Sequence, residues 1–209
     1  MFNRDGYRLS AFFICLYLIW TAKEVLFQLY SIPTPIALIV KYVIWIVPVY
    51  FYLTQIDHIQ NSWRNIGMRN AALGVKWGFL VSFMIVVIEA GLTYSFQGSF
   101  HFDLGWRWFT TLLFAIPEEV LFRGFILHKL SSSMTFMKAN LFASLLFVSI
   151  HLPIWLLQGG ASLPKLIGNG ATVFLVGYGL SLLVKRTNSL WSSTIVHTVY
   201  NLLIYLRAT

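Results

Sequence analysis

The sequence is poor in charged residues and in cysteine. Only 11% of its 209 residues are Asp, Glu, Lys or Arg, whereas 58% are hydrophobic and the mean hydropathy is +0.73. This composition excludes a soluble globular domain. The single cysteine, Cys15, lies in an apolar run, so an internal disulfide and a cysteine-based metal site are both excluded. The sequence also contains no internal repeat and no low-complexity tract.

Long apolar segments dominate the chain, each of about 20 residues, the length that spans a bilayer core. Seven of them recur: 9–30, 36–54, 72–96, 108–127, 139–157, 163–184 and 190–206. The first follows Arg4 and Arg8 as in a signal peptide, but no small-x-small cleavage site follows it, so we expect an uncleaved span. The pattern predicts an all-α polytopic membrane helix bundle of about seven transmembrane helices. We expect one integral membrane domain over residues 1–209.

The segment 55–70, between the second and third apolar segments, is too polar to span a membrane. Ile56, Ile59, Trp63 and Ile66 form an apolar stripe at helical spacing, with polar residues elsewhere on the wheel. This pattern is typical of a helix that lies flat at the membrane surface. The sequence therefore predicts one interfacial helix besides the spanning helices.

Most basic residues lie between the predicted spans. With the N-terminus inside, nine fall in or beside inner loops and three fall outside, as the positive-inside rule requires. The nine are Arg4, Arg8, Arg64, Arg69, Lys76, Lys129, Lys138, Lys185 and Arg186, and the three are Arg107, Lys165 and Arg207. This asymmetry predicts a multi-pass protein of the cell membrane, expected to be a bacterial plasma membrane, with a cytoplasmic N-terminus. The net charge of +8 indicates contacts with anionic membrane lipids, and we expect no nucleic-acid partner.

Three charges gather in the fourth segment, in the stretch Pro117-Glu118-Glu119-Val120-Leu121-Phe122-Arg123-Gly124. One charge at the centre of a membrane helix costs roughly 2.5–3.5 kcal/mol, so such a cluster indicates a functional site. Glu119 and Arg123 are four residues apart and can pair on one helical face. Glu118 points elsewhere and has no cation on its own face; such a desolvated carboxylate takes up a proton readily, which suits a general base. The alternative is a buried structural ion pair beside one satisfied glutamate.

Two further segments carry polar groups at membrane depth. These are His151 in the fifth segment, and His197 and Asn201, one helical turn apart, in the seventh. Each of them alone is more typical of packing or of an interhelical hydrogen bond. In combination, a carboxylate beside a neutral imidazole can deprotonate a water, and an imidazole with a carboxamide can donate hydrogen bonds to an oxyanion. These groups suffice for amide hydrolysis by an activated water, without a serine or cysteine nucleophile.

Three motifs in this order resemble those of a known family: Glu118-Glu119-x-x-x-Arg123, Phe147-x-x-x-His151 and His197-x-x-x-Asn201. The family is that of the type II CAAX prenyl endopeptidases and bacteriocin-processing enzymes, the CPBP or Abi family of intramembrane glutamic proteases. The resemblance covers about residues 106–209, which it implies to be the catalytic core. Residues 1–100 are then expected to form variable N-terminal helices.

The resemblance also implies a role for each motif residue. Glu118 would activate a water, with His151 as its partner. Glu119 would support the site and pair with Arg123. His197 and Asn201 would form the oxyanion hole. The sequence contains no zinc signature such as H-E-x-x-H, so no metal and no other cofactor is expected.

Three functions remain open at the level of sequence. The first, which we favour, is an intramembrane endopeptidase that hydrolyses a peptide bond of a membrane-associated or hydrophobic peptide. Its expected partners are that peptide and membrane lipids. The second is a bacteriocin self-immunity protein that binds a toxin or its receptor, since members of the family occur with bacteriocin genes. The third is a small transporter whose midplane charges bind a substrate, although no inverted repeat supports it.

Overall fold

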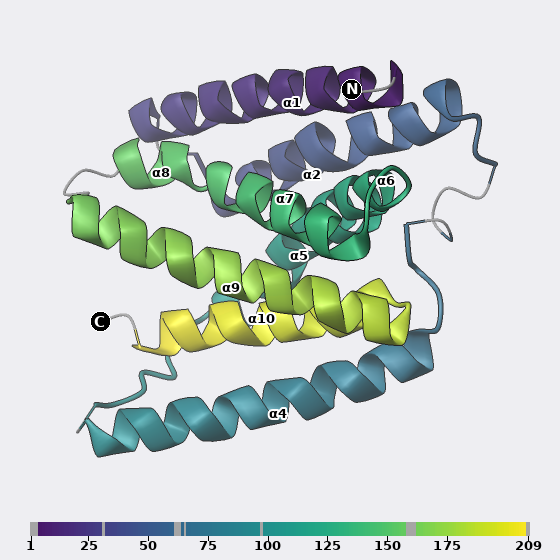
Figure 1. The fold of residues 1–209 in the computed structure, drawn as a ribbon. Coiled ribbons are helices and arrows are strands. Elements are labelled where there is room, and N and C mark those ends of the chain that lie inside the picture. Colours follow the sequence, from purple (N-terminus) through teal and green to yellow (C-terminus); the bar gives the residue numbers. More distant parts are fainter. Residues whose placement is uncertain are drawn as a thin grey trace.

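A computed structural model describes residues 4–30, 32–60, 64, 66–96, 98–157 and 162–207, and within these ranges it contains no strand. Seven helical rods run up and down the bundle (Figure 1). In chain order they are α1 (Arg4–Leu29); α2 (Thr34–Phe51) with the π-helical turn η1 (Tyr52–Ile56); α4 (Ala71–Ser95); α5 (Arg107–Glu119) continued by the π-helix η2 (Val120–Ile126) and by α6 (Leu127–Ser131); α7 (Phe136–Ser149) followed by α8 (Leu152–Leu157); α9 (Leu163–Thr187); and α10 (Leu190–Arg207).

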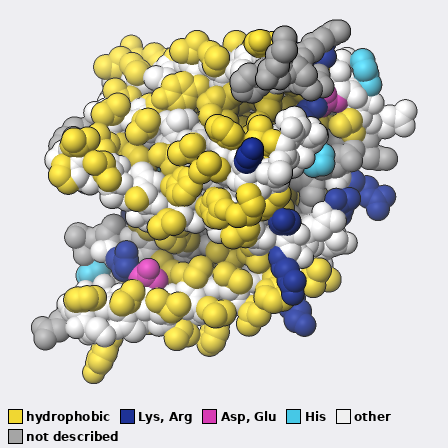
Figure 2. Space-filling model, in the orientation of Figure 1, with side chains coloured by type: hydrophobic (Ala, Val, Ile, Leu, Met, Phe, Trp, Pro, Cys, Tyr) yellow, Lys and Arg dark blue, Asp and Glu magenta, His cyan; other side chains and the backbone are white. Residues whose placement is uncertain are grey.

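The bundle has the features of a membrane protein. Five of the described helices are long and apolar enough to cross a membrane: Gly6–Leu29, Thr34–Ile56, Ala71–Ser95, Phe136–Leu157 and Leu163–Thr187. Large apolar side chains cover much of the outer surface (Figure 2), as a lipid environment allows. The start of α1 and the end of α10 lie at opposite ends of the bundle, as an odd number of passes requires (Figure 1). The predicted all-α polytopic membrane bundle is confirmed.

Among the described residues of 55–70, Arg64 is helical, but the predicted interfacial helix does not extend to either end of the segment. Gln55 and Ile56 belong to η1, residues 57–60 form a bend and a turn, and residues 66–70 form a turn and an irregular stretch. His58 and Gly67 have positive φ angles of 54° and 94°, which interrupt an α-helix. Gly67 instead accepts a hydrogen bond through its carbonyl oxygen from the backbone N–H of Leu190, at 2.9 Å. The middle of the segment, residues 61–63 and 65, lies outside the described residues.

Prolines and asparagines mark several helix ends. Pro35 and Pro164 occupy the first turns of α2 and α9, where a backbone donor is not needed. Asn188 ends α9 in the left-handed conformation, with φ 51°, and its N–H donates to the carbonyl oxygen of Val184 at 2.7 Å. Because α10 begins two residues later, α9 and α10 form a tight antiparallel hairpin.

The helix α10 lies inside the bundle, against α4, α5 and α9. The buried residues of α4 are Gly74, Gly78 and Ser82, which share one face at four-residue spacing. A Cβ added to Gly78 would lie 2.9 Å from the Cβ of Ile195, so small residues allow the two helices to approach closely. The polar residues of α10 therefore face other helices, and several of them are buried: Ser192, Ser193, Thr194, His197 and Thr198.

An aromatic core joins α1, α2 and η2. The ring of Trp45 is fully buried, and its centroid lies 4.6 Å from that of Trp20 and 5.9 Å from that of Phe122. Trp20 donates from Nε1 to the carbonyl oxygen of Ile150 at 2.9 Å, which ties α1 to the end of α7. Every residue of η2 is buried, including Arg123. Local π-helical geometry is frequent at functional sites, and here it directly follows the two glutamates.

Candidate active site

A closed polar cluster forms around Glu119, whose side chain is fully buried. Arg123 donates from Nη1 to Oε1 of Glu119 at 2.9 Å, which confirms the predicted pair. Nδ1 of His197, on α10, lies 2.8 Å from the same oxygen. The guanidinium carbon of Arg123 lies 4.3 Å from the ring centre of Phe147 on α7. We call Glu119, Arg123 and His197 the polar centre. A buried carboxylate needs such partners, and because they come from η2 and α10, the polar centre joins these two elements to α5.

Glu118 has a cation partner on another helix. Its Oε1 accepts a hydrogen bond from Nζ of Lys41 on α2. Lys41 is buried, and three aromatic ring centres lie 5.1–5.9 Å from its ammonium nitrogen, those of Trp20, Trp45 and Phe114. The expectation of a carboxylate without a cation partner is therefore wrong. Helical spacing reveals partners on the same helix, whereas this one comes from α2.

His197 lies between the two glutamates. A carboxylate only accepts, so we assign the proton on Nδ1 to the bond with Glu119. Nε2 lies 3.6 Å from Oε2 of Glu118, which is too far for a direct hydrogen bond. In this neutral tautomer Nε2 accepts, and it donates only when the ring carries both protons. The predicted oxyanion role of His197 therefore requires the doubly protonated ring.

His151 lies at the junction of α7 and α8. Its Nδ1 is 2.8 Å from the carbonyl oxygen of Phe147, so this nitrogen donates and Nε2 of the neutral ring is left as an acceptor. The ring also packs against Trp155, with a centroid distance of 5.6 Å. His151 lines the same cavity as Glu118, although in the described part of the chain no direct hydrogen bond joins the two.

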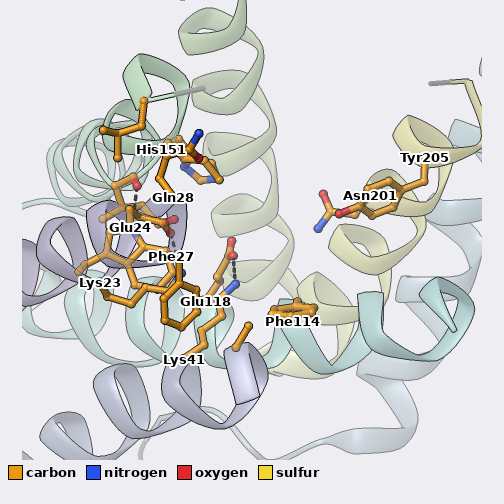
Figure 3. A pocket seen from close by; sticks show the side chains of 15 residues that line it. Lys23, Glu24, Phe27, Gln28, Lys41, Phe114, Glu118, His151, Asn201 and Tyr205 are labelled. Atoms are coloured by element: carbon orange, nitrogen blue, oxygen red, sulfur yellow. Dashed lines mark hydrogen bonds and ion pairs between the residues drawn. The ribbon is translucent and has the colours of Figure 1, made fainter. Parts of the chain in front are cut away.

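Asn201 follows His197 by one turn of α10 and is half-buried. Its carboxamide lines the cavity on the side away from Glu118 in the close-up view (Figure 3). It also lines a smaller neighbouring cavity of about 270 Å³, together with Thr111 and Arg107. The two cavities share four lining residues: Ala37, Phe114, Asn201 and Tyr205. Asn201 therefore lies where they meet.

The main cavity, about 480 Å³ in volume, brings together groups from α1, α2, α5, the junction of α7 and α8, α8 and α10. Its lining includes the exposed Gln28, in the last turn of α1, and Tyr205, near the end of α10. Among the described residues that line it there is no serine, threonine or cysteine. Its described wall therefore offers acid–base chemistry on a bound water, through Glu118 and His151, and no serine, threonine or cysteine nucleophile.

Sequence reasoning missed the charged residues that α1 and α2 bring to the cavity. These are Lys41 and the ion pair of Lys23 with Glu24, in which Nζ and Oε1 are 2.8 Å apart. Lys41 did carry a signal, because it is a charge inside the predicted span 36–54 and the argument applied to Glu118 applies to it equally. Its partner is 77 residues away in the chain, beyond the reach of helical spacing.

The described part of the chain offers few metal ligands close together. Within it, no three His, Cys, Asp or Glu side chains come together in a way that could hold a metal ion. His151 and His197 each have Nδ1 engaged, by Phe147 and Glu119 respectively, so each offers one further nitrogen. This arrangement suits water binding better than a tetrahedral zinc site with three protein ligands.

Comparison with protein families assigns the chain to a known family. The family model described as type II CAAX prenyl endopeptidase Rce1-like matches residues 100–203. The chain belongs to this family. As a member of the CPBP family it is a CAAX-type intramembrane protease. The matched range contains all six predicted site residues, whereas Lys41 and the helices α1, α2 and α4 lie outside it. No curated protein and no solved structure matches the chain.

Proposed function

We propose that this CPBP-family protein hydrolyses a peptide bond of a membrane-associated or hydrophobic peptide by means of a water that Glu118 activates. The observation that carries the proposal is the convergence of Glu118, His151 and Asn201, from three separate rods, on one cavity. Ionisable and polar groups at membrane depth are expensive, and their convergence on a cavity is typical of a catalytic site. Family membership supplies the reaction class, and these side chains supply the mechanism.

The proposed reaction begins with a water held by Glu118 and by the acceptor nitrogen of His151. Glu118 takes a proton from the water as its oxygen bonds to the carbonyl carbon of the substrate. The carbonyl oxygen becomes an oxyanion, to which Asn201 donates from Nδ2 and His197 from Nε2 when its ring carries both protons. The C–N bond then breaks, and Glu118 returns the proton to the leaving amine. Atoms and charges balance without a cofactor.

Glu119 and Arg123 act on this reaction through His197. Neither of them lines the cavity, and both are buried in the polar centre. The bond from His197 to Glu119 fixes the imidazole ring so that Nε2 faces Glu118. Arg123 in turn neutralises Glu119. We therefore propose positioning roles for this pair.

We further propose that the substrate reaches the cavity from the extracytoplasmic side of a bacterial plasma membrane. The cavity lies toward the turn from α1 to α2, with Gln28 at its rim, whereas α1 begins at the other end of the bundle. Many of the Lys and Arg side chains visible in Figure 2 gather at that other end, where α9 turns into α10. The positive-inside rule assigns the basic end to the cytoplasm. A hydrophobic peptide tethered in the outer leaflet fits this access.

The orientation is tested with alkaline-phosphatase fusions. A fusion after Thr209 should be active and a fusion near Ser132 inactive, because alkaline phosphatase folds into its active form only outside the cytoplasm. The reverse pattern would place the cavity on the cytoplasmic side and overturn the proposed access, while leaving the hydrolytic mechanism untouched.

The reaction itself is tested in proteoliposomes with a quenched fluorogenic peptide that ends in a farnesylated Cys-Ala-Ala-Xaa sequence, the substrate type in the family's name. Wild type should cleave it at one bond, and Glu118→Gln should not. In parallel, membrane and secreted peptides from cells that produce either form identify other substrates by mass spectrometry. Wild-type turnover in Glu118→Gln would show that the base is assigned wrongly.

A further inference from the structure

The mechanism proposed above makes no use of Lys41, a lysine with only 6% of its surface exposed, in the wall of the catalytic cavity. A buried ammonium group is costly unless it is paired. Lys41 meets this requirement with Glu118, to which its Nζ donates, and with the surrounding aromatic rings. Trp45, one of these rings, is itself fully buried, so the lysine is held in a fixed environment.

Glu118 has several charged or titratable neighbours, but their hydrogen bonds differ. Arg123 and His197 both bond to Glu119, and His151 bonds to a backbone carbonyl. On α1, Lys23 is paired with Glu24. Among the cationic side chains that the structure describes, Lys41 donates a hydrogen bond directly to Glu118.

The two oxygens of Glu118 consequently have different surroundings. Oε1 accepts from Lys41, whereas Oε2 lies 3.6 Å from Nε2 of His197. A carboxylate held through one oxygen by an ammonium group presents the other oxygen in a fixed direction. Oε2, which Lys41 does not hold, is thus the oxygen left to receive a proton from a water.

We infer that Lys41 is a positioning residue, which keeps Glu118 as a carboxylate and directs Oε2 toward the attacking water. The inference rests on the proposed role of Glu118 as the base. A desolvated carboxylate without a cation takes up a proton at higher pH, and a protonated Glu118 accepts no proton from water. Lys41 lies outside the family match, so the N-terminal helices would set the pH range in which the matched half works.

The first test is the pH–activity profile of Lys41→Met with the farnesylated peptide in proteoliposomes. Its acidic limb should move to higher pH by about one unit or more, so that turnover measured within that limb is about tenfold lower or less and recovers as the pH rises. Lys41→Arg keeps the positive charge and should keep the limb near its wild-type position. Lys129→Met is the matched control, since Lys129 does not line the cavity and its Nζ lies 2.6 Å from Oδ2 of Asp57. The pH–activity profile of this variant should stay unchanged.

The outcomes separate this inference from the proposed function. A wild-type profile in Lys41→Met, with Glu118→Gln inactive, overturns the role of Lys41 and leaves the mechanism standing. Activity in Glu118→Gln overturns the mechanism first. A lower but pH-independent rate in Lys41→Met, or the same shift in Lys129→Met, shows a structural effect and also overturns the inference.

A second measurement needs no substrate. Thermal unfolding of wild type, Lys41→Met, Glu118→Gln and the double variant forms a cycle in detergent at high pH. Each single change leaves one buried charge without its partner, so the double variant should melt above Lys41→Met. A double variant no more stable than the single ones would show that the pair is not coupled, and would overturn the inference even if Lys41→Met were too unstable to assay.

Discussion

Glu118 and Glu119 are adjacent in sequence, yet they belong to two different regions of the molecule. Glu119 sits in the polar centre, fully buried, where Arg123 and His197 both bond to its Oε1. Glu118 belongs to the cavity wall, which it forms with Lys41, His151 and Asn201. The polar centre is closed and joins three helical elements, whereas the cavity wall is open to a volume of about 480 Å³. Two adjacent residues of one helix can thus have different environments: one carboxylate lies inside a buried polar cluster, and its neighbour lines a cavity.

The largest effect should follow from Glu118→Gln, which removes the base from the cavity wall. We expect turnover to fall by about 10³-fold or more at every pH, in line with the loss of a general base. Hydrolysis of the fluorogenic peptide by purified enzyme measures this. Glu24→Gln is a matched control, because Glu24 lines the same cavity but pairs with Lys23; a comparable loss there would point to cavity charge in general rather than to Glu118.

The corresponding change in the polar centre, Glu119→Gln, should act chiefly on stability. It leaves Arg123 as an unpaired buried charge, and we expect a loss of about 3–5 kcal/mol in the free energy of unfolding. Adding Arg123→Met should recover much of that stability but little activity, because His197 still lacks its anchor. Thermal unfolding and turnover, measured on the same samples, separate the two effects. Full activity in the stable double variant would contradict the positioning role.

Asn201→Ala tests the other side of the cavity wall. The loss of one oxyanion donor costs about 2.7–4 kcal/mol in other hydrolases, so we expect kcat to fall by roughly 10²- to 10³-fold. KM should change little, since the contact forms mainly in the transition state. Steady-state kinetics distinguishes the possibilities: a raised KM with unchanged kcat would make Asn201 a binding residue instead.

A smaller effect is expected from Gly177→Ala on α9, which adds a methyl group against Arg123 of the polar centre. The added Cβ would lie 3.0 Å from Nη2 of Arg123 and 3.0 Å from Cδ1 of Phe147. We expect a loss of about 1–3 kcal/mol in unfolding free energy, as for other overpacked interiors. Gly179→Ala is the control on the same helix, because no atom lies within 4 Å of the Cβ it would add. Equal melting temperatures for the two variants would argue against tight packing around Arg123.

No effect is expected from exhaustive chelation of the purified enzyme. The proposed reaction uses Glu118, His151 and Asn201 on a water, and it has no step that needs a metal. Turnover before and after treatment with a zinc chelator checks this, with metal content measured on the same sample. Stoichiometric zinc, together with activity that is lost on chelation and regained on zinc addition, would move the reaction to a metal-bound water and leave the protease class intact.

The helices could be predicted from the sequence because their signals are local. The apolar segment expected at 72–96 is α4 at Ala71–Ser95, and that expected at 163–184 is α9 at Leu163–Thr187. The bond between Glu119 and Arg123 was equally local, since helical geometry alone brings residues four apart together. The stripe in 55–70 predicted a helix that is too long, because Gly67 and His58 adopt backbone angles that an α-helix excludes.

The contacts between helices could not be predicted in the same way. Lys41 meets Glu118 across 77 residues and His197 meets Glu119 across 78. Such pairs depend on how each helix is rotated and how closely it packs, which small residues such as Gly74 and Gly78 help to decide. The sequence therefore singled out polar groups of the matched half, but not which groups on different helices would bond to one another.

Two rods carry most of the motif residues: α10, and the run from α5 to α6. Among the described residues, these two are not among the helices that are long and apolar enough to cross a membrane. During biosynthesis, a segment with buried charged or polar side chains partitions poorly from the translocon into lipid by itself. The helices α4 and α9 precede α10 in the chain and pack against it, and both are apolar enough to insert unaided. The polar groups needed for hydrolysis thus make assembly depend on partner helices. In a truncated chain that lacked α4, the polar face of α10 would lose the helix it packs against. We would expect quality-control proteases to degrade such a chain before it cleaved any peptide.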